Sequence, residues 1–71
     1  MIIMITYNIS QRSDEPKYYY LYKQIKKDIL TGAIASGDKL PSKRNLAEHL
    51  GISLITVENA YSMLKDEGYI E

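Results

Sequence analysis

The sequence contains no cysteine, which rules out disulfide bonds and thiolate chemistry. This lack is consistent with a reducing, cytoplasmic setting. No apolar run approaches the roughly 20 residues that a membrane helix needs. The apolar opening MIIMITYNI has neither a basic leader nor a small-residue cleavage site, so it does not resemble a signal peptide. With 71 residues, the chain is long enough for one small domain, and we expect no membrane partner.

Groups of residues that could support catalysis are also scarce. His49 is the single histidine, and without cysteine it has no partners for a zinc site. Asp66 and Glu67 are adjacent, and adjacent side chains on a helix diverge by about 100°, so they cannot share a reacting atom. The four glycines are scattered and form no phosphate-binding loop. We therefore expect no enzyme, no metal site and no cofactor in this chain.

Net charge is absent as well, because nine basic residues balance nine acidic ones. The distribution is nevertheless uneven. From Pro41 to Glu71 there are three basic residues, and two of them, Lys43 and Arg44, are adjacent in the first turn of a predicted helix. The acidic residues at the far end of this part are Asp66, Glu67 and Glu71. This polarity favours contact with an anionic partner near Lys43, although basic residues on a helix are usually only solvated.

Hydrophobic periodicity predicts the elements in the first half of the chain. Period-two alternation of Ile3, Ile5, Tyr7 and Ile9 favours a strand with one buried face. A polar loop follows. The period then becomes helical, with a stripe formed by Tyr18, Leu21, Tyr22, Ile25 and Ile29. Gly32 is a predicted helix stop, and Gly37-Asp38 is a predicted tight turn.

The second half predicts two further helices joined by a short turn. Ser42 and Ser53 are predicted N-caps, and Gly51 separates the helices. Ile52 and Val57 occupy the two positions of a hydrophobic staple. The apolar stripe of the third helix is Val57, Ala60, Tyr61 and Leu64, and Gly68 is its stop. This order predicts a mainly α, three-helix helix-turn-helix fold with a strand beginning at Tyr69.

The outward face of the third helix follows from its stripe. Ile55, Asn59 and Ser62 point most directly outward, Thr56 and Glu58 flank them, and Ser53 is at the tip. Such side chains can bond phosphates or base edges. Ile55 has two interpretations of equal weight, a thymine-methyl contact or an ordinary exposed apolar residue. Leu54 is expected to pack at the edge of the core.

The tyrosines of the first helix divide into two pairs. Tyr18 and Tyr22 lie on the core stripe, whereas Tyr19 and Tyr20 lie off it. Tyr19 and Tyr20 could stack on nucleic-acid bases. We favour burial against a neighbouring element or a second subunit.

The segment GDKLPSKRNLAEHLGISLITVENAYSMLKDEGYIE resembles the DNA-binding domain of the GntR family of bacterial transcriptional regulators. The features that carry the resemblance occur in the family's order: Leu40-Pro41-Ser42, Arg44, Leu46-Ala47, Leu50-Gly51-Ile52-Ser53, Thr56-Val57, Ala60 and Glu67-Gly68-Tyr69-Ile70. TVENAY and ITYNI resemble the MocR/PdxR-like or the YtrA-like branch. The resemblance implies a winged helix-turn-helix in residues 16–71, preceded by a strand and linker in 1–15.

The resemblance also implies a function for individual residues. The family's DNA-contacting positions correspond here to Lys43, Arg44, Ser53, Leu54, Ile55, Thr56 and Glu58. Leu54 and Ile55 differ from the residues that are common in the family, and Glu58 is arginine in some relatives, which bears on the operator sequence. Asn59 joins this set from its outward position on the helix.

Family properties outside this segment are expectations of the same kind. A member is expected to form a homodimer and read two half-sites of a double-stranded DNA operator. MocR-type members carry pyridoxal phosphate in a further C-terminal domain, which this sequence does not contain. Because the wing would begin at Tyr69, the chain is expected to be a fragment with an incomplete wing.

The sequence therefore supports two functions. The first is a sequence-specific DNA-binding domain with its third helix in the major groove. The second is a helix-turn-helix fold used for protein contact or dimerisation, with Leu54, Ile55 and the tyrosines as the interface.

Overall fold

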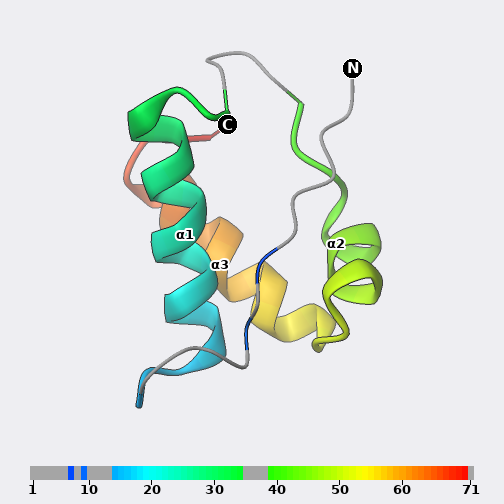
Figure 1. The fold of residues 1–71 in the computed structure, drawn as a ribbon. Helices are drawn as coiled ribbons and strands as arrows, with labels where there is room; N and C mark the ends of the chain where they lie inside the picture. The colour runs from blue at the N-terminus through cyan, green and yellow to red at the C-terminus, as the bar shows by residue number, and fades with distance from the viewer. Residues whose placement is uncertain (1–6, 8, 10–13, 35–38, 71) are drawn as a thin grey trace.

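A computed structural model of the chain describes Tyr7, Ile9 and residues 14–34 and 39–70. These residues form α1 (Lys17–Thr31), α2 (Lys43–Leu50) and α3 (Leu54–Asp66). Helix α3 packs against both α1 and α2 and lies between them in the view of Figure 1. The mainly α, three-helix prediction is confirmed. The predicted N-terminal strand and the turn at 37–38 fall mostly or wholly outside the described residues.

Helix α1 buries the predicted stripe at its centre. Leu21, Tyr22 and Ile25 are buried, and Ile29 packs partly against the same core. The helix begins after Pro16, whose carbonyl accepts hydrogen bonds from the backbone N–H groups of Tyr19 and Tyr20, at 3.1 Å each. Tyr20, predicted to lie off the stripe, also packs against the core. The expected burial is therefore partly met for Tyr20, whereas Tyr19 is 38% exposed.

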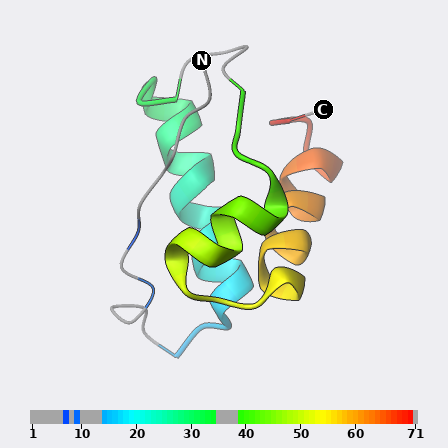
Figure 2. The ribbon, with the colours of Figure 1, turned by 90° about the vertical axis from the view of Figure 1, so that its right-hand side faces the viewer.

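Helices α2 and α3 are joined by the turn of residues 51–53, visible in yellow in the lower part of Figure 2. Gly51 has a φ of 70°, a left-handed conformation that disfavours a side chain. Its N–H donates to the Glu48 carbonyl, and the Ile52 N–H donates to the Ala47 carbonyl at 3.0 Å. This paired closure satisfies the last carbonyls of α2. The predicted stops at Gly32 and Gly68 also have positive φ.

Both predicted serine caps are formed. Ser42 accepts a hydrogen bond from the Asn45 N–H, and Ser53 accepts one from the Thr56 N–H, each at 3.1 Å. Such caps satisfy N–H groups that have no partner within the helix. Caps and stops together fix where α2 ends and α3 begins, and therefore the angle between them.

A single hydrophobic core holds the three helices together. Helix α1 contributes its buried stripe, and residues outside the helices contribute Ile9 and Ile34. The remaining members come from α2 and α3: Leu46, Ala47, Val57, Ala60, Tyr61 and Leu64. Because α3 contributes the most buried residues of any helix, its opposite face is held at a defined position on the surface.

Candidate nucleic-acid interface

The outward face of α3 is arranged as the helical periodicity predicts. Its inward stripe is buried from Val57 to Leu64. On the other side, Glu58, Asn59 and Ser62 are exposed, and Ile55 keeps 66% of its surface accessible. One helix therefore presents a polar face with an apolar residue in its first turn.

Leu54 departs from its prediction. It was expected to pack at the edge of the core, yet it is 37% exposed and is not among the residues packed against the core cluster. Leu54 is the first residue of α3 and lies before Val57, the first buried residue of that helix. Leu54 and Ile55 therefore form an exposed apolar pair at the tip of α3.

Ser53 and Thr56 form a hydroxyl pair at the same tip. In addition to the cap, their side-chain oxygens lie 2.7 Å apart, and either hydroxyl can donate to the other. Two hydroxyl hydrogens are present and this contact uses one of them. The pair therefore retains one hydrogen that can donate to an external acceptor such as a phosphate oxygen.

Lys43 and Arg44 occupy the first turn of α2, immediately after the Ser42 cap, and both are exposed. Basic side chains in a first turn oppose the helix dipole, which is positive at that end. Helical stability alone therefore gives no reason for this pair, whereas an anionic partner does.

A buried hydrogen bond links the start of α2 to α3. The Tyr61 hydroxyl donates to the Pro41 carbonyl at 2.8 Å. Pro41 is almost completely buried and precedes the cap residue of α2. Burial raises the pKa of Tyr61 to about 12. The sequence marked Tyr61 only as a core residue, since the periodicity gives no signal for the partner of its hydroxyl.

The acidic end of α3 is occupied by contacts to α1. The Tyr22 hydroxyl donates to Glu67 Oε1 at 2.6 Å, and Lys26 Nζ lies 3.8 Å from the same oxygen. This hydrogen bond to Glu67 raises the pKa of Tyr22. Lys26 also lies over the Tyr22 and Tyr69 rings. Glu67 therefore joins two helices, a role different from that of a paired catalytic carboxylate.

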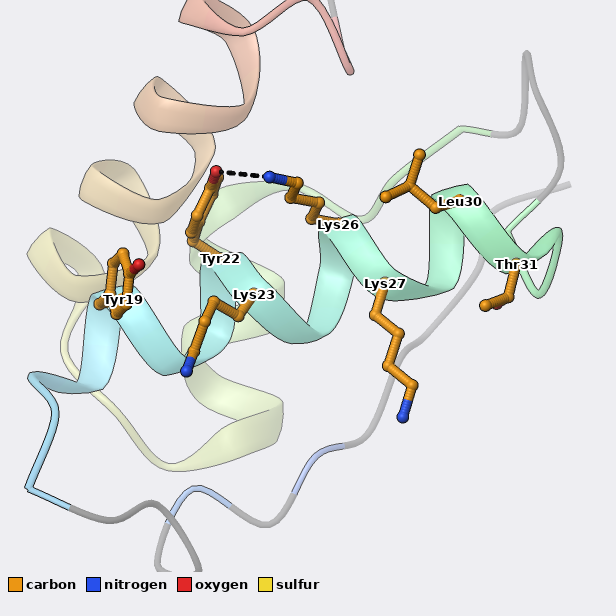
Figure 3. Close-up of a pocket in the computed structure, with 7 residues that line it drawn as sticks. All are labelled: Tyr19, Tyr22, Lys23, Lys26, Lys27, Leu30 and Thr31. Atoms are coloured by element: carbon orange, nitrogen blue, oxygen red, sulfur yellow. Dashed lines mark hydrogen bonds between the residues drawn. The ribbon is translucent and has the colours of Figure 1, made fainter.

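A hollow on the outer side of α1 shares Tyr22 and Lys26 with these contacts (Figure 3). Lys26 donates to the Tyr22 hydroxyl along one side of it, and the Lys23 ammonium lies 5.2 Å from the centre of the Tyr19 ring. Lys23 also forms an ion pair with Glu15. All its lining residues belong to α1, so the hollow includes none of the residues predicted to contact DNA.

The position of His49 and the described helices bear on the question of metal and membrane partners. His49 is exposed in the last turn of α2. Among the described residues, no group of His, Cys, Asp or Glu is placed to hold a metal ion. No helix in the described part of the chain is long and apolar enough to cross a membrane.

A three-helix core, a short turn between capped helices and an exposed polar face on the second of them define a helix-turn-helix DNA-binding domain. The chain belongs to the GntR family: the family model described as "Bacterial regulatory proteins, gntR family" matches residues 17–71. It is the helix-turn-helix DNA-binding domain that transcriptional regulators of this family share.

Curated relatives from Bacillus subtilis agree with this assignment. The chain is 48% identical over 66 residues to the uncharacterized HTH-type transcriptional regulator YdeL, covering 93% of this chain and 14% of YdeL. It is 43% identical over 63 residues to the HTH-type transcriptional repressor YtrA, covering 89% of this chain and 48% of YtrA. The chain therefore spans less than half the length of either relative.

A solved structure agrees as well. YtrA from Sulfolobus acidocaldarius, a GntR-family transcription factor, is 44% identical to this chain with a TM-score of 0.83. The match covers 89% of this chain and 67% of that one. Both the MocR-like and YtrA-like resemblances have named relatives.

Proposed function

We propose that the chain binds double-stranded DNA by placing α3 in the major groove, with Lys43 and Arg44 contacting phosphates beside it. The observation that carries this proposal is that α3 has an exposed polar face and that α2, whose exposed first turn is basic, is joined at its start to α3 by the Tyr61–Pro41 hydrogen bond. In helix-turn-helix proteins the start of the second helix contacts base edges, while the first helix approaches the backbone.

Each exposed group of α3 has a chemical partner in the groove. Asn59 can bond adenine through its amide, and Glu58 can accept from the cytosine amino group. Ile55 can contact a thymine methyl group, with Leu54 beside it at the tip. The remaining hydrogen of the Ser53–Thr56 pair can donate to a phosphate.

Charge placement supports the same orientation. The acidic end of α3 faces α1, where Glu67 is held by Tyr22 and Lys26. The basic first turn of α2 begins shortly after Pro41, whose carbonyl accepts a hydrogen bond from Tyr61 of α3. The anionic backbone of DNA would therefore meet Lys43 and Arg44 at the start of α2, while Glu67 is engaged by α1.

A homodimer on two half-sites is the second part of this proposal. One copy has a net charge of zero, and phosphate neutralisation supplies most non-specific affinity for DNA. Two joined copies would combine two weak contacts on one operator. The proposed DNA partner also places the protein in the cytoplasm.

Salt dependence of binding tests the first part. The chain is titrated with a mixed-sequence duplex, and with a duplex selected from a random pool, over a range of salt concentrations. Counterion release predicts that log affinity falls linearly with log salt, by about 0.9 for each phosphate neutralised. Arg44→Ala should reduce the magnitude of this slope by about 0.9, the contribution of one phosphate contact, without changing the helical content.

Lys65→Ala is the matched control, because Lys65 is an exposed cation in the last turn of α3. It should leave the slope unchanged. Equal slopes for Arg44→Ala, Lys65→Ala and the unmodified chain would show that Arg44 contacts no phosphate.

Protein contact is the competing function, and the exposed Leu54 and Ile55 favour it. An interface built on these apolar residues would not release counterions. Binding to duplex DNA that is absent, or independent of salt, would therefore support protein contact over DNA recognition.

A further inference from the structure

We propose that Tyr61 is a positioning residue: its hydroxyl holds the Pro41 carbonyl and thereby sets where the basic first turn of α2 lies relative to α3. This inference deepens the proposed DNA-binding function and depends on it for its consequence, namely that Lys43 and Arg44 meet the phosphates while α3 lies in the groove.

The hydrogen bond is well placed for this role. Its donor and acceptor are separated by 20 positions in sequence and are both buried. Pro41 has no N–H group, so its carbonyl is its only backbone hydrogen-bonding group. That carbonyl precedes the helical ladder of α2, whose first bond runs from the Leu46 N–H to the Ser42 carbonyl. Tyr61 therefore binds the chain just before α2 begins.

Helix α2 is consequently held at both ends. At its C-terminal end, the turn at Gly51 and Ile52 connects it covalently to α3. Between the ends, Leu46 and Ala47 contribute apolar packing, which is not directional. The Tyr61 bond is a directional contact at the N-terminal end.

A tilt of α2 about the turn shows why the Tyr61–Pro41 hydrogen bond matters for DNA binding. The eight residues of α2 extend over about 12 Å at roughly 1.5 Å per residue. A tilt of about 10° around the turn would move the first turn of α2 by about 2 Å, several times the roughly 0.5 Å tolerance of a pre-organised site. Lys43 and Arg44 would then meet the phosphates in a broad range of positions.

Distance measurements between spin labels test the tether directly, and the cysteine-free sequence permits labelling at chosen sites. One pair is Asn45→Cys with Lys65→Cys, which reports the start of α2 against α3. The second pair is Glu48→Cys with Lys65→Cys, which reports the end held by the turn. All three positions are exposed.

Tyr61→Phe keeps the ring and removes the hydroxyl. We expect it to broaden the distance distribution of the Asn45 pair and to leave that of the Glu48 pair unchanged. Tyr22→Phe is the matched control, because it removes a tyrosine hydroxyl bond between α1 and Glu67 that does not touch α2. It should broaden neither distribution.

DNA binding supplies the functional measurement, made with the selected duplex at a temperature where every variant is fully folded by circular dichroism. Tyr61→Phe should weaken binding by about threefold to tenfold, the range that one net hydrogen bond can account for. Tyr22→Phe should bind like the unmodified chain.

Unchanged distances in Tyr61→Phe, or broadened distances with unchanged affinity, would overturn the positioning role. If Tyr61→Phe does not fold, the test uses the labelled chains that keep Tyr61. A distance distribution much broader for the Asn45 pair than for the Glu48 pair would then show that the Tyr61 hydrogen bond does not hold the start of α2. If the unmodified chain shows no salt-dependent binding, the DNA-binding proposal fails, while the distances still report separately whether Tyr61 holds α2.

Discussion

Replacing Ser53 by alanine would remove the cap of α3. The Ser53 oxygen accepts the Thr56 N–H at 3.1 Å and contacts the Thr56 hydroxyl at 2.7 Å. Loss of a serine cap costs about 1 kcal/mol of unfolding free energy. In a domain of this size, that change lowers the thermal midpoint by roughly 4–8 °C. Thermal denaturation followed by circular dichroism measures the shift.

Ser53→Asp separates capping from DNA contact. Aspartate also caps, and its charge is favourable at a helix N-terminus by about 0.3–1 kcal/mol, so the thermal midpoint should equal or exceed that of the unmodified chain. The same charge would lie where the proposed geometry puts phosphates. Repulsion of about 1 kcal/mol at 4 Å in water predicts roughly fivefold weaker DNA binding.

Ala33→Asp controls for the change in net charge. Ala33 is exposed and follows α1, whose C-terminal end lies away from the start of α3 in Figure 1. It should reduce binding much less than Ser53→Asp at the same salt concentration. Equal binding by the two aspartate variants would refute the placement of Ser53 near phosphates. An unchanged midpoint in Ser53→Ala would refute the energetic contribution of the cap.

Two further predictions concern stability. Gly51→Ala should lower the unfolding free energy by about 1 kcal/mol in urea denaturation, because φ is 70° there, although an added Cβ would meet no atom within 4 Å. A midpoint equal to that of the unmodified chain would show that the turn relaxes at no cost. For Tyr61, the folded-state pKa of about 12 exceeds the usual 10.0, so its contribution is complete below pH 10 and is lost as pH rises toward 12. The unfolding free energy of Tyr61→Phe should therefore fall less steeply between pH 10 and pH 12 than that of the unmodified chain. Equal slopes of unfolding free energy against pH would contradict the burial of the hydroxyl.

The three helices were predictable because local signals mark both their faces and their ends. Ser42 and Ser53 are caps, and Gly51 is a stop, so each boundary depends on chemistry within a few residues. The exposed face of α3 followed from its buried stripe by helical geometry alone. Ile55 is exposed as that geometry predicts.

Contacts between distant segments were not predictable in the same way. The bonds from Tyr61 to Pro41 and from Tyr22 to Glu67 join residues that only the packing of helices brings together. Leu54 was misplaced because periodicity gives the direction of a side chain and not whether a neighbouring helix extends far enough to cover it. The DNA-contacting roles of Lys43, Arg44 and the α3 residues remain predictions.

Joining two copies of the chain tests whether one copy alone has a low affinity for DNA. The tip of α3 offers Leu54 and Ile55 where a cation would add affinity, and the net charge is zero, so one copy should bind DNA poorly. A Gly/Ser linker of about 40 residues spans roughly 35 Å on average, close to the one-turn spacing of about 34–36 Å between half-sites.

On a duplex with two selected half-sites at that spacing, the linked pair should bind about 10²-fold to 10⁴-fold more tightly than one copy, because the second contact becomes intramolecular. On a duplex with one half-site, linked and single chains should bind alike, apart from the doubled number of binding domains. Moving the half-sites apart by half a helical turn should reduce the gain, since the second α3 would then have to reach a more distant site on the opposite side of the duplex. Equal affinity of the single and linked chains on the two-site duplex would contradict this prediction. The α3 face of one copy, together with Lys43 and Arg44, would then provide the full binding energy without a second subunit.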